Sequence, residues 1–350
     1  MLSRVEPMSA ETAAAITWWY DLGALAGDLV LAARGEQGRI WRLQTSRGSW
    51  AVKELLFPVE EQQAARDVEF QLAARSAGIP LPMPRRTRDG QVVLPADRAA
   101  AARAIRVYQW ADLAPDQVVT PAEVGAVTAS LHLLEREAEP GPVEAWFSEP
   151  LGESAWADLL DDARRGGAPW EAALGRWLPD LIALDGAVSP PDPARTMTCH
   201  RDINIENIRC SADGGVVVLD WENCGPAEPA RELATVICDL ATELSPDAAQ
   251  VGYAAYLASE GPERLDSVGD FAMAAAAQGH LLQFYSRRAL DAGESAENKT
   301  RSAKRLHDML SQPLTLAWAG YLLDLIGSQA ALLYRRQHCY FLVVLPAASV

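Results

Sequence analysis

The sequence predicts an α+β protein with two lobes: an N-terminal five-stranded antiparallel sheet with one main helix, and a mostly helical C-terminal lobe. Three observations support this prediction. Before residue 112, β-branched and aromatic residues occur in short runs separated by turn signals. After residue 112, apolar residues recur at helical spacing almost throughout. The only later β signal is one hairpin near residue 210. We therefore expect one lobe at residues 1–112 and a second, helical lobe at residues 113–350.

Five runs in the N-terminal lobe have the composition of strands. They are residues 29–34, 39–43, 49–55, 91–94 and 104–110. The first two enclose a turn that contains Gly35 and Gly38. Glycines in such a turn let backbone amides approach a phosphate closely, and ordinary turn chemistry is the alternative interpretation.

A strand lysine and a helical glutamate form a candidate charged pair. Lys53 lies in an apolar strand, where an ammonium group needs an anionic partner. The helix predicted from residue 59 to about residue 76 carries Glu69 at the edge of its inward face. We expect Lys53 to pair with Glu69, while Glu61 and Asp67 remain rival partners on the same helix.

The helical lobe begins with a strong start signal. Thr120-Pro121-Ala122-Glu123 combines a capping box with proline at the first helical position. The further predicted helices cover residues 143–165, 168–186, 230–244, 247–259, 267–290, 297–310 and 313–334. The last is apolar over about twenty positions, but Asp324 within it favours a buried helix over a membrane span.

Composition limits the classes of partner. The formal net charge of −16 argues against nucleic-acid binding, which needs a basic surface, and it would attract cationic small molecules. Five cysteines without zinc-like spacing suggest buried thiols in a reducing compartment. No secretory signal is visible at the N-terminus. We expect a cytoplasmic monomer or homodimer that contacts neither membrane nor nucleic acid.

Polar side chains converge at the end of the predicted hairpin. Residues 208–210 are expected to pair with residues 216–220, which brings Asn207 opposite Leu219 or Asp220. Asp202 lies on the loop just before the first strand. Two carboxylates and an amide oxygen suit a hard cation such as Mg²⁺.

Two motifs around this hairpin resemble those of a known enzyme family. His200-Arg201-Asp202 is followed five residues after the aspartate by Asn207, and Leu219-Asp220-Trp221-Glu222 comes next. Together with the strand lysine, they resemble the aminoglycoside phosphotransferase family. This family is a branch of the protein-kinase-like fold that also includes choline and fructosamine kinases. The resemblance runs from about residue 29 to residue 244.

The resemblance implies a role for each motif residue. Asp202 would orient the acceptor hydroxyl and take its proton late in the transfer. Asn207 and Asp220 would hold Mg²⁺ between the β- and γ-phosphates. Lys53, paired with Glu69, would hold the α- and β-phosphates.

The same resemblance implies a nucleotide-binding lobe at residues 1–112 and a lobe with the catalytic loop and the substrate site at residues 113–350. The glycine turn with Gly35 and Gly38 would cover the triphosphate of ATP (or GTP). Main-chain groups near Tyr108–Ala111, Gln109 among them, would face the base, with Trp110 lining the site. Three departures stand out. The family usually has glycine at the position of Arg201 and aspartate at that of Glu232, and the glycine turn lacks the common Gly-Gly or Ser-Asn form.

We therefore expect a phosphotransferase that moves the γ-phosphate of a nucleoside triphosphate to a hydroxyl of a cationic small molecule. An aminoglycoside or another antibiotic is the leading acceptor. A metabolic kinase for choline, a sugar or a related metabolite is the first alternative. A nucleotide-binding pseudokinase or regulatory module is the second.

Overall fold

The structure is a computed structural model that describes residues 8–36, 38–139 and 141–339, with backbone alone for residues 328–339. The chain forms two compact units. The first comprises Met1–Val119 with His200–Gly225, and the second comprises Thr120–Cys199 with Pro226–Val350. The division predicted at residue 112 stays a prediction, and it differs from these units because residues 200–225 belong with the first of them.

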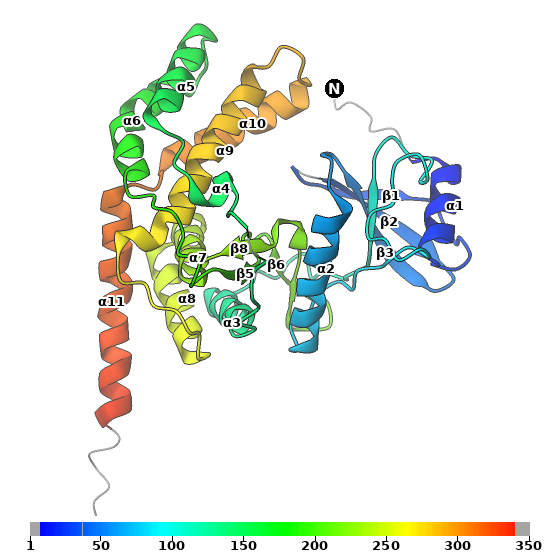
Figure 1. The fold of residues 1–350 in the computed structure, drawn as a ribbon, viewed down its shortest axis with the longest axis horizontal. Helices are drawn as coiled ribbons and strands as arrows, with labels where there is room; N and C mark the ends of the chain where they lie inside the picture. The colour runs from blue at the N-terminus through cyan, green and yellow to red at the C-terminus, as the bar shows by residue number, and fades with distance from the viewer. Residues whose placement is uncertain (1–7, 37, 140, 340–350) are drawn as a thin grey trace, which may run out of the picture. The chain divides into compact units, whose positions relative to one another are not determined.

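A four-stranded antiparallel sheet organises the first unit. Its strands, in the order β1-β2-β3-β4, are β1 (Val30–Arg34), β2 (Gly38–Thr45), β3 (Gly48–Leu55) and β4 (Ile105–Gln109) (Figure 1). Helices α1 (Ala10–Trp19) and α2 (Glu61–Ser76) belong to the same unit. The register places Lys53 on β3 between Ile40 of β2 and Arg106 of β4.

The predicted fifth strand, Gln91–Leu94, is wrong as a strand. Its backbone amides are used elsewhere, since Val92 N and Val93 N donate to the Glu61 carboxylate at 2.7 and 2.9 Å. Only Leu94 pairs with the sheet, as an isolated bridge to Ile105. Pro95 follows, and its missing N–H prevents the ladder from continuing.

Two apolar clusters hold this unit together. One packs α1 against the sheet, and its buried Tyr20 donates to the carbonyls of Val92 and Ile105 at 2.9 Å. The other packs α2 against the sheet through residues that include Leu55 and Val68. Both β3 and α2 are therefore fixed in place by buried apolar surface.

The predicted hairpin is present in the first unit. Strand β6 (Ile208–Cys210) pairs with β7 (Val216–Val218) in a register that sets Cys210 opposite Val216. Leu219 N donates to Asn207 O at 2.7 Å, so of the two partners predicted for Asn207, Leu219 and Asp220, the structure has Leu219. Val218 N donates to Pro80 O at 2.9 Å, and Ala114 N donates to Cys210 O at 2.9 Å. These bonds explain why the hairpin belongs with the first unit.

The second unit is mostly helical, as predicted. Its helices are α3 (Pro121–His132), α4 (Ala145–Ser148), α5 (Glu153–Arg165), α6 (Glu171–Asp185), α7 (Pro229–Glu243), α8 (Pro246–Ala258), the 3₁₀ turn η2 (Val268–Phe271), α9 (Ala272–Leu290), α10 (Ala296–Ser311) and α11 (Leu316–Cys339). The expected capping box starts α3 at Thr120. The helix predicted over 143–165 is interrupted around Pro150, because proline removes a backbone donor and Gly152 adopts a φ of +88°.

Close packing characterises this helical unit. A side chain on Gly125 of α3 would overlap the Gly252 carbonyl of α8, so a glycine is required there. Short strands β5 (Met197–Cys199) and β8 (Gly225–Ala227) pair with each other. Among the described helices, none has both the length and the apolar character to cross a bilayer.

Candidate active site

Lys53 projects from β3 into a carboxylate-rich site. Its Nζ lies 2.7 Å from Asp220 Oδ1 and 2.9 Å from Glu222 Oε2, and its side chain is 8% exposed. Burial alone would lower the pKa of Lys53, but the Glu222 and Asp220 carboxylates raise it above its usual value. Gly38 makes room for the lysine stem, since a Cβ there would lie 3.0 Å from Lys53 Cε. The lysine is thus a fixed positive charge.

The predicted pairing of Lys53 with Glu69 is not found. Glu69 lies on the exposed side of α2, while Asp67 faces the sheet and pairs with Arg106 Nη1 at 3.1 Å, with both side chains 1% exposed. Successive helical residues are rotated by about 100°, so a residue two positions from Asp67 points away from the sheet. Of the rivals on this helix, Glu61 caps the amides of Val92 and Val93 instead.

The left-handed conformation of Asp220 places the carboxylates of Asp220 and Glu222 on the same side of the chain. Asp220 has φ 57° and ψ 61°, and it leads directly into the 3₁₀ turn η1 (Trp221–Asn223). The tight turn buries Trp221 to 2% exposure against Phe70. Both carboxylates therefore face Lys53. Such a backbone costs strain for a residue other than glycine, and aspartate is among those that tolerate it best.

Asp202 is held by three asparagines. Asn223 Nδ2 donates to Asp202 Oδ2 at 3.2 Å, and Asn204 Nδ2 donates to Asp202 Oδ1 at 3.1 Å. Asn207 Nδ2 donates to Asp202 O at 2.9 Å, which leaves the amide oxygen of Asn207 as the atom suited to a cation. Burial, together with the charge of Asp220, raises the pKa of Asp202 to about 7.

The groups around Lys53 carry more negative than positive charge, which suits a divalent cation. Asp202, Asp220 and Glu222 offer three carboxylates against one ammonium group, because Arg106 is paired with Asp67. Burial raises the pKa of Asp220 to about 6. The positive charge of Lys53 acts to lower this pKa, but the negative charge of Glu222 acts together with burial to raise it. The Asp220 carboxylate and the Asn207 amide oxygen are hard oxygen donors that fit Mg²⁺.

A cavity of about 550 Å³ in the first unit lies beside these charges. Lys53, Asn207, Asp220 and Glu222 line its polar end. Its apolar walls are made by residues of the sheet and the hairpin, among them Ala32, Ile40, Ala51 and Leu219. This volume is typical of small-molecule pockets.

The residues predicted to face the base also line this cavity. Gln109 N donates to Met83 O at 2.8 Å, and Trp110 N donates to Ser49 O at 3.0 Å. The Trp110 ring is fixed by the Arg42 guanidinium, 4.7 Å from its centroid. In the glycine turn, Gly35 N donates to Gly38 O at 2.9 Å, while residue 37 lies outside the described residues.

Comparison with known proteins decides the family. A sequence model of the family described as "Phosphotransferase enzyme family" matches residues 28–268, more than half of the chain. The chain belongs to the phosphotransferase enzyme family. The resemblance inferred from the motifs is thereby confirmed, and the protein is a phosphotransferase that acts on hydroxyl groups of small molecules. No curated protein matches the sequence.

Solved structures show the same fold at low identity. A spectinomycin phosphotransferase, in complex with ADP and spectinomycin, has 13% identity and a TM-score of 0.64, covering 91% of this chain and 100% of its own. An amicoumacin kinase bound to AMP-PNP and Ca²⁺ has 13% identity and a TM-score of 0.56, covering 86% and 92%. A microcompartment-associated aminopropanol kinase has 16% identity and a TM-score of 0.54, covering 86% and 95%. The predicted kinase-like fold class is confirmed.

The sequence analysis did not identify three residues of the candidate site. Glu222 was visible in the second motif, two residues after Asp220, but nothing linked it to Lys53. Tyr108 donates its hydroxyl to Glu222 Oε1 at 2.7 Å, and Asn223 binds Asp202. Neither has a sequence signal, because both contacts join positions that are distant along the chain or separated by a turn.

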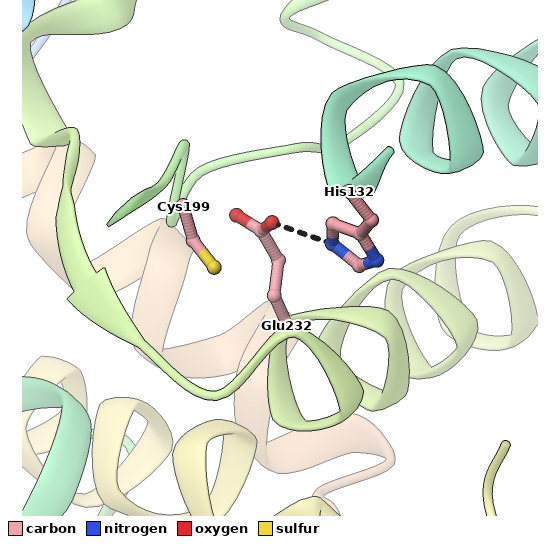
Figure 2. A group of neighbouring side chains, drawn as sticks. All are labelled: His132, Cys199 and Glu232. Atoms are coloured by element: carbon pink, nitrogen blue, oxygen red, sulfur yellow. Dashed lines mark hydrogen bonds and ion pairs between the residues drawn. The ribbon is translucent and has the colours of Figure 1, made fainter. Parts of the chain in front are cut away.

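A second polar cluster of the phosphotransferase lies in the helical unit (Figure 2). His132 Nε2 lies 2.9 Å from Glu232 Oε2, and His132 Nδ1 lies 2.9 Å from the Tyr256 hydroxyl. Cys199 Sγ completes a group whose possible ligand atoms lie within 4.8 Å of one another. Both ring nitrogens already have hydrogen-bond partners, and all of these residues are buried. We therefore interpret the cluster as a structural network that joins α3, α7 and α8.

Proposed function

We propose that this phosphotransferase uses ATP and Mg²⁺ to phosphorylate a hydroxyl of a cationic small molecule, with an aminoglycoside or another antibiotic as the leading acceptor. The observation that carries the proposal is the arrangement of Lys53, Asp220 and Asn207 around one cavity, with Asp202 held beside them. Phosphoryl transfer depends mainly on positioning and charge neutralisation, and this set provides both.

The nucleotide would enter the 550 Å³ cavity with its base toward Trp110 and its phosphates toward Lys53. The amides of Gln109 and Trp110 already donate within the unit. Ala111 follows them and also lines the cavity, and among the described residues its amide makes no hydrogen bond. An amide donor suits N1 of adenine, which accepts, better than N1–H of guanine, which donates. This favours ATP over GTP.

Each charged residue then has a defined task. Lys53, held at a fixed position by Asp220 and Glu222, would bind phosphate oxygens of the nucleotide. Asn207 and Asp220 would hold Mg²⁺, which when bound neutralises charge that develops on the phosphates. Asp202 would orient the acceptor hydroxyl and receive its proton, and its raised pKa makes it a better proton acceptor than an ordinary carboxylate.

The cationic character of the acceptor is inferred from charge. The chain carries a formal net charge of −16, which concentrates cations near its surface by long-range attraction. The solved relatives include enzymes named for spectinomycin, amicoumacin and aminopropanol. A metabolic amino alcohol is therefore the second candidate acceptor, and the aminopropanol kinase is the observation that favours it.

A turnover screen with Mg²⁺ tests the proposal. ATP and GTP are each offered with spectinomycin, other aminoglycosides, basic cyclic peptides, macrolides, choline and aminopropanol, and ADP or GDP release is measured. Asp202→Ala serves as the control, and it should lose roughly 10²–10⁴-fold in kcat while retaining nucleotide binding. Turnover that survives this change contradicts the role of Asp202. A wild-type protein that binds no nucleotide contradicts the whole proposal.

A further inference from the structure

Arg201 occupies a backbone conformation that suits glycine. Its φ is +63°, in the left-handed region, where a side chain is strained and glycine is not. The phosphotransferase family usually has glycine at this position. Strained residues persist where their surroundings hold them, often at functional sites. The contacts of the arginine side chain therefore need an explanation.

The Arg201 guanidinium is buried against the turn that follows the metal-binding motif. Arg201 is 6% exposed, its Nε donates to Asn223 O at 2.6 Å, and its Nη2 reaches Cys224 O at 3.4 Å. Its planar donors thus hold two successive carbonyls of the chain.

Gly225 provides the space for this guanidinium. A Cβ on Gly225 would lie 2.6 Å from Arg201 Cζ and 2.6 Å from Nη2, which is closer than two such atoms can approach. Gly225 does not adopt a left-handed conformation, so close approach is the reason for glycine there. Arg201 and Gly225 therefore fit each other as a pair.

The turn held by Arg201 contacts the catalytic carboxylate. Asn223, whose carbonyl accepts from Arg201, donates its side-chain amide to Asp202 Oδ2 at 3.2 Å. Arg201 is also the immediate neighbour of Asp202 in the chain. Two restraints thus meet on one aspartate, the backbone of residue 201 and the amide of Asn223.

We propose that Arg201 is a positioning residue for phosphoryl transfer. Its guanidinium packs over Gly225 and fixes the turn at residues 223–225, so that the side chain of Asn223 stays hydrogen-bonded to Asp202. The inference rests on the proposed function. It assigns a role to a residue that departs from the usual family motif. Misplacing a reacting group by about 1 Å can cost on the order of 10² in rate.

A double-mutant cycle tests this pair. Gly225→Ala fills the space and displaces the guanidinium, which is the end of a flexible side chain. We expect it to lower kcat by about 10–100-fold at unchanged KM for ATP. Arg201→Gly should show a similar loss, and adding Gly225→Ala to it should cost nothing more, because the methyl group then meets no guanidinium. ATP turnover is measured with water as acceptor, so no acceptor need be known.

Two further measurements separate positioning from general stability. In nucleotide-free protein, amide exchange of the segment 221–225 should be faster in Gly225→Ala than in wild type. Arg201→Lys keeps the charge but loses the planar donors, and it should lose kcat, whereas Arg209→Lys on β6 is the matched control and should not. If Gly225→Ala does not fold, the comparison of Arg201→Lys with Arg209→Lys decides.

The outcomes distinguish this inference from the proposed function. A wild-type protein that binds no ATP overturns both. If the wild type binds ATP but does not hydrolyse it, the amide-exchange comparison of Gly225→Ala with wild type decides on the role of Arg201. If the wild type is active and the Gly225→Ala variant is equally active, the role of Arg201 is refuted, while the proposed function is not. An alanine cost that is the same with and without Arg201 also overturns it, because the two residues would then act independently.

Discussion

The neutral variant Glu222→Gln should loosen the lysine on which the site depends. Glu222 accepts from Lys53 Nζ at 2.9 Å and from the Tyr108 hydroxyl at 2.7 Å, and its side chain is 6% exposed. Glutamine keeps the shape but removes the charge, so Lys53 retains only Asp220 as an ionic partner. Glu69→Gln is the matched control, since Glu69 lies on the exposed side of α2.

The size of the effect follows from burial. Removing one partner of a buried ion pair costs about 3–5 kcal/mol when the other charge is left alone. Lys53 is not left alone, because Asp220 remains 2.7 Å away and the glutamine oxygen can still accept a hydrogen bond. We therefore expect about 2 kcal/mol, which corresponds to a fall in Tm of roughly 3 °C for a chain of 350 residues. Glu69→Gln should stay within about 0.5 kcal/mol.

The contribution of the Glu222 charge to stability has a characteristic dependence on pH. Burial acts to raise the pKa of Glu222, but Lys53 and Arg106 hold it well below its usual value. A carboxyl with a depressed folded pKa stabilises the protein above its unfolded pKa and loses that contribution as the pH falls. The Tm difference between wild type and Glu222→Gln should therefore be complete at pH 7 and narrow below about pH 4.

Thermal unfolding and ATP binding are measured for both variants from pH 3 to pH 8. If Glu69→Gln weakens ATP binding as much as Glu222→Gln does, the helical glutamate is the partner of Lys53 after all. If Glu222→Gln matches wild type at pH 7, the two contacts of Glu222 contribute nothing and our account of the lysine is refuted.

Three further changes probe other parts of the molecule. Gly38→Ala should weaken ATP binding by about 1 kcal/mol in calorimetry, because its methyl group would press on Lys53 Cε, and unchanged affinity would contradict this packing. Glu232→Gln should lower the unfolding free energy by roughly 2–4 kcal/mol in urea, since His132 loses its buried carboxylate, and a loss below about 0.5 kcal/mol would argue against the network. Burial raises the pKa of Asp202 to about 7, so its contribution to stability is complete below about pH 4 and is lost as the pH rises through 7. Asp202→Asn should therefore gain in Tm over metal-free wild type across that range, and a difference independent of pH would oppose the assignment.

The sequence alone determined the features that depend on local pattern. Alternation and turn residues placed the four paired strands, and the turn between residues 210 and 216 located the hairpin. The sequence left two registers open, and the structure has the one that sets Cys210 opposite Val216 and Asn207 opposite Leu219. Local patterning also predicted one strand wrongly, because Gln91–Leu94 has the composition of a strand but donates two of its amides to the Glu61 carboxylate.

Tertiary structure decided which charges meet. Glu69, Asp67 and Glu61 were comparable partners for Lys53 in the sequence, since a helical pattern fixes a face only to within about one residue. Burial of Asp67 against Arg106 settled the phase of α2, and the left-handed turn at Asp220 supplied Lys53 with carboxylates from a segment 167 residues away. Long-range electrostatic pairing depends on positions in space that no local periodicity encodes, so the motifs identified the site and only the fold assigned its partners.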